Sequence, residues 1–275
     1  MPIAFSVITD EISPDPADGI AFALEEGLDR VDVRSIDGVN FLSLDSADQK
    51  RVARQIKDAG LHVGCLATPL LKWPAPGKSA GNSGDQFGFD AKGRSIDEIY
   101  ASAFAAADVL GTRNLRIFSY LTYAGFKLAD LEAPYIALLK LAERHDMVLH
   151  VENEPVCNVL SVADLGLLMQ AWKHPRLKGL LDIANSAHAG KPTTPLEVAT
   201  VMPWVDQVHF KDYAGACKAY VATGEGDIPY AELLVPCCKA AVVRDLVWTI
   251  ETHVPDDQPG ATRRSLQAVR GLATG

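Results

Sequence analysis

Hydrophobic positions along the chain fall into short runs that alternate with longer amphipathic segments. Eight of these runs predict β-strands: Ile3–Thr9, Arg30–Ser35, His62–Thr68, Asn114–Ser119, Met147–Glu152, Lys178–Ile183, Val205–Phe210 and Val247–Glu251. Most intervals between them carry a helical pattern. Strands that alternate with helices pair in parallel, and eight such units can close into a (β/α)8 TIM barrel. No linker or shift in composition divides the chain, so we expect an α/β protein with a single TIM-barrel domain over residues 1–275.

Two features between the strands are also informative. Ser46 with Gln49, and Ser95 with Glu98, predict capping boxes that open two of the helices. The stretch Trp73–Gly93 is rich in Gly, Pro, Ser and Lys and predicts a long loop after the third strand. Loops of this length are commonly either lids or disordered segments, and the sequence leaves both open.

Polar residues alternate with apolar ones in the last four strands, although strands of a parallel barrel are buried on both faces. In the fifth strand, His150 and Glu152 share one side, and the leucine and valine between and before them share the other. The same alternation puts Asp182, His209 and Glu251 on the polar side of the next three strands. We expect the apolar sides to pack against the helices and the polar sides to face the barrel axis.

Glu152, Asp182, His209 and Glu251 are therefore expected at the carboxyl ends of four successive strands, the face on which TIM-barrel enzymes carry their active sites. Three carboxylates close together resist ionising, and a divalent cation relieves their repulsion. Oxygen and imidazole ligands favour Mn²⁺, Mg²⁺ or Co²⁺ over a thiolate-preferring metal. A single acid at a strand end is usually a loop residue or a cap. The prediction of one metal ion rests on two features that all four residues share, the inward side of a strand and a place at its carboxyl end.

Composition excludes several classes of protein. The chain has 275 residues, of which 48% are hydrophobic and 22% charged, as is typical of a globular protein. Its net charge of −9, without a basic cluster, argues against nucleic acid as a partner. The apolar stretch nearest the N-terminus is too short for a signal peptide or a membrane span. Five cysteines without scaffold or metal-ligand spacing fit a reduced, cytoplasmic protein.

Seven short motifs follow one another along the chain. They are ITDEIS at Ile8–Ser13, VDVRSIDGVN at Val31–Asn40, VENEP at Val151–Pro155, LLDIANSAHAG at Leu180–Gly190, VHFKDY at Val208–Tyr213, TGEGDIPY at Thr223–Tyr230 and IETH at Ile250–His253. Their order and positions resemble the xylose-isomerase-like family of sugar phosphate isomerases and epimerases over nearly the whole chain. Each motif alone is short, and together they are specific for the family but not for a substrate.

The resemblance implies that Glu152, Asp182, His209 and Glu251 hold one divalent metal ion, commonly Mn²⁺ in this family. It also implies that Glu152 and Glu251 are the acid/base pair that exchanges a proton at a carbon next to a carbonyl. The metal would stabilise an enediolate while one carboxylate removes the proton and another returns it. We therefore expect a metal-dependent isomerase or epimerase of a small sugar, keto-sugar or sugar phosphate. Oligomers are common in the family, so a homo-oligomer is also expected.

Substrate contacts are less sharply indicated. The candidates are Arg34, Lys72, Asn185, His188, Lys211 and His253. Asn185 stands where many relatives carry a histidine, and no arginine soon follows His209, as one does in some epimerases. For Arg34, the competing interpretation is an inward ion pair with Asp10 or Glu11.

Three other functions are compatible with this type of barrel. A metal-dependent dehydratase (lyase) of inosose or dehydroshikimate type would abstract the same proton and then expel a hydroxyl group. A DNA-repair enzyme resembling endonuclease IV would need three metals and many histidines, whereas this chain offers Thr68 and Ser119 near the ends of the third and fourth strands. A barrel that binds a sugar without catalysis is the third.

Overall fold

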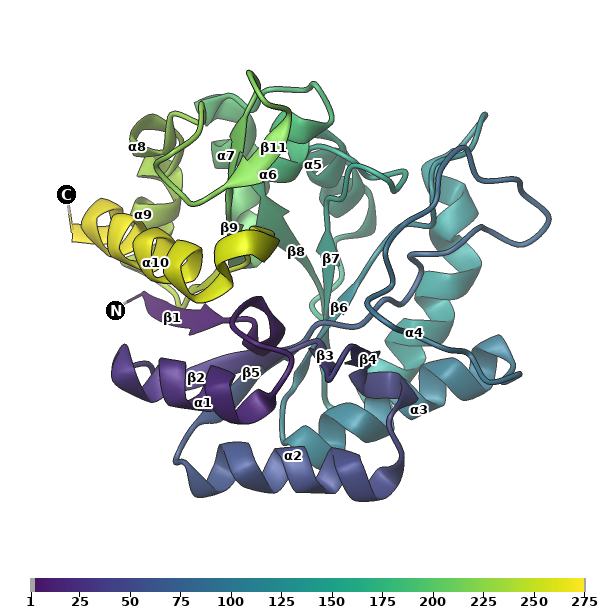
Figure 1. Cartoon of the computed structure of the whole chain (residues 1–275). Coiled ribbons are helices and arrows are strands. Elements are labelled where there is room, and N and C mark those ends of the chain that lie inside the picture. The colour runs from purple at the N-terminus through teal and green to yellow at the C-terminus, as the bar shows by residue number, and fades with distance from the viewer. Residues whose placement is uncertain (1–2, 275) are drawn as a thin grey trace.

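Parallel strands pair side by side in the order β1-β12-β9-β8-β7-β6-β5-β2 in the computed structural model, which describes residues 3–274. The strands are β1 (Ala4–Val7), β2 (Arg30–Val33), β5 (His62–Leu66), β6 (Asn114–Ile117), β7 (Val148–Glu152), β8 (Leu177–Asp182), β9 (Val205–Phe210) and β12 (Val247–Ile250). Their bounds differ from the predicted ones by at most two residues. A parallel bridge between Ile8 and Asp32 closes the sheet, so the predicted (β/α)8 TIM barrel is confirmed (Figure 1).

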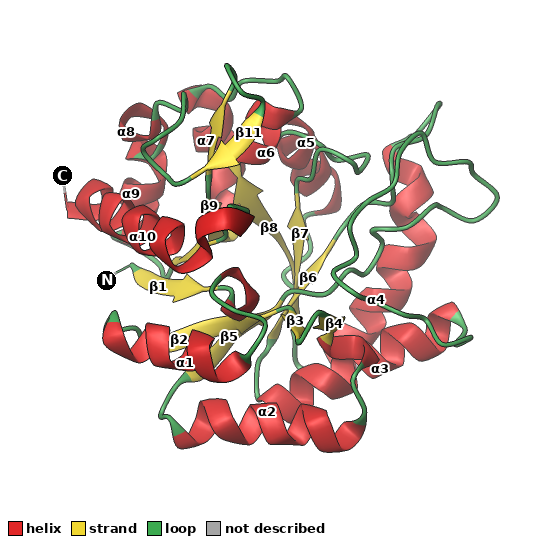
Figure 2. Ribbon diagram, in the orientation of Figure 1, coloured by secondary structure: helices red, strands yellow, loops and turns green. Residues whose placement is uncertain are grey.

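Helices surround the strands as an outer layer (Figure 2). They are α1 (Pro16–Glu25), α2 (Ser46–Asp58), α3 (Ile96–Leu110), α4 (Glu132–His145), α5 (Val162–Trp172), α6 (Ile183–His188), α7 (Pro195–Val201), α8 (Tyr230–Leu233), α9 (Val235–Ala241) and α10 (Gln258–Thr274). Short 3-10 turns span Thr9–Glu11, Phe41–Ser43, Leu128–Leu131, Met202–Trp204 and Pro255–Asp257. Among the described residues, no helix combines the length and hydropathy needed to cross a bilayer.

Two small hairpins follow strands of the barrel. In one, β3 (Ser35–Ile36) pairs with β4 (Val39–Asn40) after β2; in the other, β10 (Asp212–Ala214) pairs with β11 (Ala219–Val221) after β9. Both lie at the carboxyl end of their strands and therefore extend the barrel on the face where the predicted site lies.

The helix termini agree with the predicted capping boxes at one place and differ at another. Ser95 and Glu98 form the predicted box at the start of α3. The predicted box of Ser46 with Gln49 is wrong, because Asp45 is the N-cap and its carboxylate accepts two first-turn backbone N–H groups at 2.9 Å. A carboxylate one residue earlier satisfies these amides and also complements the helix dipole, which leaves Ser46 as the first helical residue.

The barrel interior beneath the site is polar. Asp32 accepts hydrogen bonds from Ser6 Oγ at 3.0 Å, Gln207 Nε2 at 2.6 Å and Thr249 Oγ1 at 3.0 Å. Asp32 and Gln207 come from strands that do not pair with each other, so their bond crosses the interior. A Cβ at Gly64 would lie 2.6 Å from Asp32 Oδ1, which explains a glycine in the middle of β5. The polar sides of β9 and β12 therefore face inward, as predicted, and those of β1 and β2 do so as well.

The predicted long loop is present, since the chain forms no helix or strand between Leu66 and Ile96. Its second half is tied down: Asn40 donates to the Gly88 carbonyl at 3.2 Å, and the Gln86 side chain donates to the Lys72 carbonyl at 2.8 Å. A Cβ on Gly88 would collide with a neighbouring carbonyl oxygen. Together these contacts hold Phe87 in the left-handed region, with a φ of 53°.

Candidate metal centre

Glu152, Asp182, His209 and Glu251 meet at the carboxyl end of the barrel. Glu152 and Asp182 end β7 and β8, His209 is the last residue but one of β9, and Glu251 directly follows β12. Each offers one ligand atom, and these atoms lie within 4.8 Å of one another. None of the four side chains is more than 2% exposed. Three carboxylates and one imidazole at this spacing fit a divalent ion that prefers oxygen ligands.

Asn153 fixes the ends of β7 and β8 against each other. Its Oδ1 accepts from the Asp182 backbone N–H at 2.9 Å, and its Nδ2 donates to the Asp182 carbonyl at 2.6 Å. Asp182 Oδ1 in turn accepts from the Asn185 N–H at 2.8 Å, as the N-cap of α6. The Asn185 side chain donates to the Asn153 carbonyl at 2.9 Å and lies 3.5 Å from Glu152 Oε1. Local hydrogen bonds therefore set the positions of two of the carboxylates.

Glu251 is surrounded by basic side chains, which are Arg34, Arg116, His209, Lys211 and His253. Its Oε1 lies 2.9 Å from Arg34 Nη1 and 3.3 Å from Arg116 Nη1. Its Oε2 lies 2.8 Å from Lys211 Nζ and 3.2 Å from His209 Nδ1. Burial works against ionisation, but Lys211, His253 and His209 outweigh it and hold the pKa of Glu251 well below its usual range.

Arg116, on β6, is a site residue that the sequence pattern did not single out. Its Nη1 donates to Glu152 Oε2 at 3.1 Å and to Glu251 Oε1 at 3.3 Å, and the residue is 1% exposed. Burial raises the pKa of Glu152, but Arg116 and His209 more than offset this and lower it to about 2. The sequence carried a signal, because Arg116 alternates with the apolar Leu115 and Ile117, and its register with His150 shows that it lies on the inward side of its strand.

Lys211 places an ammonium group among the same carboxylates. Its Nζ lies 2.5 Å from Asp182 Oδ2 and 2.8 Å from Glu251 Oε2. Burial disfavours the charge of Lys211, but Asp182 and Glu251 outweigh it and raise its pKa. Burial also lowers the pKa of His209, whereas Glu152 and Glu251 raise it to about 9. Without a metal ion, these two cations offset much of the carboxylate charge.

A cavity of about 260 Å³ borders the cluster. Its lining includes four of the predicted substrate contacts, Lys72, Asn185, His188 and His253, together with Phe87 and Tyr220. Tyr220 donates to Asn185 Oδ1 at 2.9 Å, and its hydroxyl lies 2.8 Å from His188 Nδ1. Lys72 Nζ lies 3.2 Å from Glu154 Oε2. The cavity is thus small, and it combines several polar side chains with an aromatic ring on its loop side.

The other two predicted contacts, Arg34 and Lys211, face the carboxylates rather than this cavity. All three side-chain nitrogen atoms of Arg34 lie within 3.0 Å of a carboxylate oxygen, on Asp10, Glu11 and Glu251. The competing interpretation of Arg34 as a partner of Asp10 or Glu11 therefore holds for both acids, with Glu251 as a third.

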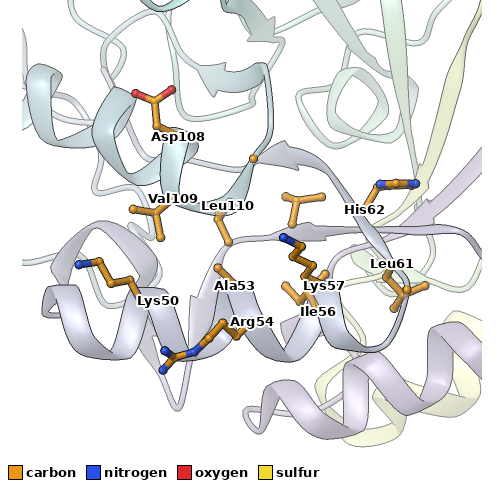
Figure 3. A pocket seen from close by; sticks show the side chains of 13 residues that line it. Lys50, Ala53, Arg54, Ile56, Lys57, Leu61, His62, Asp108, Val109 and Leu110 are labelled. Atoms are coloured by element: carbon orange, nitrogen blue, oxygen red, sulfur yellow. The ribbon is translucent and has the colours of Figure 1, made fainter.

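A larger cavity, of about 680 Å³, lies away from this cluster. Figure 3 shows Lys50, Arg54 and Lys57 of α2 along it, opposite Val109 of α3. It borders Gly60 and the residues that begin β5, so it belongs to the amino-terminal face of the barrel. Barrel enzymes carry their chemistry on the opposite face, so we do not assign the active site to this cavity although it is the larger of the two.

No family model matches the sequence, and no curated protein matches it. Solved structures share its fold over nearly the full length of both chains. The probable 3-DHS dehydratase AsbF of Bacillus anthracis is 18% identical with a TM-score of 0.70, over 96% of this chain and 99% of that one. The IolI protein with a bound zinc atom is 12% identical with a TM-score of 0.72, over 99% and 98%.

A D-allulose 3-epimerase from Methylomonas sp. is 15% identical with a TM-score of 0.73, over 98% of both chains. Further matches include a xylose isomerase domain protein from Planctomyces limnophilus. The predicted resemblance is therefore confirmed at the level of the fold, which is that of the xylose isomerase-like TIM barrels.

Proposed function

We propose that the protein is a divalent-metal-dependent isomerase or epimerase of a small sugar, keto-sugar or sugar phosphate. The observation that carries this proposal is the convergence of Glu152, Asp182, His209 and Glu251 in one buried cluster beside a small cavity. Solved structures of the same fold include a D-allulose 3-epimerase and a D-tagatose 3-epimerase-like protein, which supports a sugar-like substrate.

Glu152 and Glu251 are the proposed acid/base pair. Each has one oxygen toward Arg116 and the other toward His209, so both rest in the ionised form. Arg116 touches both and fixes their relative positions. One carboxylate would remove a proton beside the carbonyl, and the other, after taking a proton from water, would deliver it to the resulting enediolate. A divalent ion, when bound, polarises the carbonyl and stabilises the negative charge that develops on its oxygen.

Mn²⁺ is the proposed ion, with Mg²⁺ and Co²⁺ as the nearest alternatives. Three of the four ligand-type residues are carboxylates, the ligand type that these ions favour. Because IolI was solved with zinc, Zn²⁺ belongs in the same comparison. The proposed setting is the reducing cytoplasm, in keeping with five free cysteines.

A dehydratase is the second candidate, and Lys211 is the observation that favours it. A departing hydroxyl group needs a proton, and the buried ammonium beside Asp182 and Glu251 is a donor at the right end of the barrel. AsbF, described as a probable 3-DHS dehydratase, has the same fold. Such an enzyme would use the same carboxylate to remove the first proton.

Deuterium exchange separates the two candidates. The Mn²⁺-loaded protein is incubated in deuterated water with ketohexoses and, in parallel, with inosose and dehydroshikimate, and followed by NMR and absorbance. Deuterium uptake beside the carbonyl without loss of water supports the isomerase or epimerase. Loss of water, with a new conjugated enone from inosose or a new aromatic ring from dehydroshikimate, supports the dehydratase.

Glu152→Gln tests the acid/base assignment within that assay. We expect exchange to fall at least about 100-fold, because the amide cannot accept the proton. Glu143→Gln, at an exposed glutamate of α4, is the matched control and should exchange at the natural rate. Full exchange by Glu152→Gln would contradict the assignment.

A further inference from the structure

Glu251 belongs to two groups of ligand-type side chains. Besides the four-residue cluster, Glu11, Glu251 and His253 each place one ligand atom within 4.8 Å of the other two. Glu251 presents Oε2 to His209 Nδ1 at 3.2 Å and Oε1 to His253 Nε2 at 3.7 Å. A carboxylate shared in this way is what bridges two ions, roughly 3.5 to 4 Å apart, in two-metal enzymes.

The guanidinium of Arg34 lies between the two carboxylates of this second group, Glu11 and Glu251. Its Nη2 lies 2.6 Å from Glu11 Oε1, and its Nη1 lies 2.9 Å from Glu251 Oε1. Glu11 Oε1 also lies 3.0 Å from His253 Nδ1, so the guanidinium contacts the same oxygen atoms that an ion held by this group would need. A guanidinium stays protonated under all conditions a folded protein meets, so this cation is permanent.

The surroundings keep the guanidinium in place. The side chain of Arg34 is 4% exposed, and the ring of Phe87 lies over it with 4.0 Å between the guanidinium carbon and the ring centre. Glu11 Oε2 is held separately, by the His253 backbone N–H at 2.8 Å and Thr252 Oγ1 at 3.2 Å. These bonds to Oε2 orient the Glu11 carboxylate so that Oε1 points at Arg34, and they do not involve the arginine.

We infer that Arg34 takes the place of a second metal ion, so that this barrel combines one exchangeable ion with one built-in cation. The inference rests on the proposed metal-dependent function and deepens it. Arg34 is a positioning residue: it holds Glu251 Oε1 and leaves Oε2 to the exchangeable ion. Removing its charge opens the second group to a metal.

Manganese stoichiometry tests this directly. Protein stripped with a chelator is titrated with Mn²⁺ and followed by calorimetry and by electron paramagnetic resonance, which separates an isolated ion from a coupled pair. The natural chain is expected to bind one ion with an isolated spectrum. Arg34→Met removes the charge and keeps much of the volume, and it is expected to bind two ions with a coupled spectrum. Arg34→Lys keeps a cation and should bind one.

Arg94→Met is the matched control, because Arg94 is a half-buried arginine that bonds Ser102 and backbone carbonyls outside the site. It should bind one ion. Two ions in the natural chain, or one in Arg34→Met, would overturn the inference alone. Failure of Arg34→Met to fold even with Mn²⁺ present would also overturn it, since a second ion should replace the lost charge. A natural chain that binds no ion would overturn the proposed function as well.

Discussion

The ammonium group of Lys211 lies 2.5 Å from Asp182 Oδ2, the oxygen that a metal ion would also need. Asp182 Oδ1 is already engaged, because it accepts the Asn185 N–H as a helix cap. Lysine and a metal ion would therefore compete for one oxygen atom, and binding of the ion would displace Nζ. The metal-free and metal-bound proteins would then differ in the position of the Lys211 ammonium group.

Lys211→Met should destabilise the metal-free protein and tighten its hold on metal. Removing one partner of a buried ion pair costs about 3 to 5 kcal/mol, here because Asp182 and Glu251 lose their closest cation. Urea unfolding with and without Mn²⁺ measures both effects. Lys191→Met is the control, since Lys191 forms only an exposed pair with Asp164 at 3.4 Å and should cost less than about 1 kcal/mol. Unchanged Mn²⁺ affinity in Lys211→Met would rule out the competition.

Mn²⁺ binding should depend on pH through His209. Burial lowers the pKa of this imidazole, but Glu152 and Glu251 raise it to about 9, so the ring carries a proton near neutrality. A histidine that binds a metal ion must be neutral, and binding therefore releases that proton. Affinity should rise about tenfold per pH unit below the pKa, which calorimetry between about pH 6.5 and 8.5 can follow. A flat profile would contradict the assignment of His209 as a ligand.

The raised pKa of His209 also determines how the stability of the metal-free protein changes with pH. Because the folded-state pKa lies above the ordinary 6.5, protonated His209 stabilises the fold fully below pH 6.5. That contribution is lost as the pH rises through about 9. Metal-free protein should therefore unfold at lower urea concentration at the alkaline end, and Mn²⁺ should reverse the trend.

The four ligand-type residues could be predicted because strand periodicity and position at a strand end are local properties. For Arg116, the same alternation predicts only that the side chain faces inward and not that it reaches the carboxylates. It lies one layer below Glu152, in register with His150, and only the length of its side chain brings the guanidinium among the carboxylates. Phe87 lies in a loop whose path depends on contacts with the β3–β4 hairpin, which no local pattern encodes.

Because the backbone of Phe87 is strained, its glycine and alanine variants should differ in stability in the opposite order to the usual one. Its φ of 53° lies in a region that costs a bulky residue about 1 kcal/mol or more. Phe87→Gly and Phe87→Ala both remove the ring, but only glycine relieves the strain. We expect Phe87→Gly to be the more stable of the two by about 1 kcal/mol in urea unfolding, the reverse of the usual order.

Phe89 provides the matched pair for that experiment. It lies in the same loop, and its φ is not in the left-handed region. There the alanine variant should be the more stable one, by about 0.5 to 1 kcal/mol. The same order of stabilities at both positions would show that the strain at Phe87 does not affect the free energy of unfolding.

Gly64 and Gly166 should respond to alanine in opposite directions. A Cβ at Gly64 would lie 2.6 Å from Asp32 Oδ1 and push on the hydrogen bonds that cross the barrel, at a cost of about 1 to 3 kcal/mol. A Cβ at Gly166, in α5, meets nothing within 4 Å, and alanine there should add about 0.5 to 1 kcal/mol. Thermal unfolding of both variants is sufficient, and a neutral Gly64→Ala would mean that Asp32 can move aside freely.

The position of Glu251 in the sequence affects how the chain can fold while it is being synthesised. A ribosome completes Arg34, Arg116, His209 and Lys211 before it reaches this one carboxylate, which all four contact. It also completes β1 and β9 before β12, the strand that lies between them. An unfinished chain therefore holds an open sheet, and its inward basic side chains lack the one carboxylate that all four of them contact. The barrel can close only after β12 has been made, and protease digestion of nascent chains arrested before and after β12 would reveal that order.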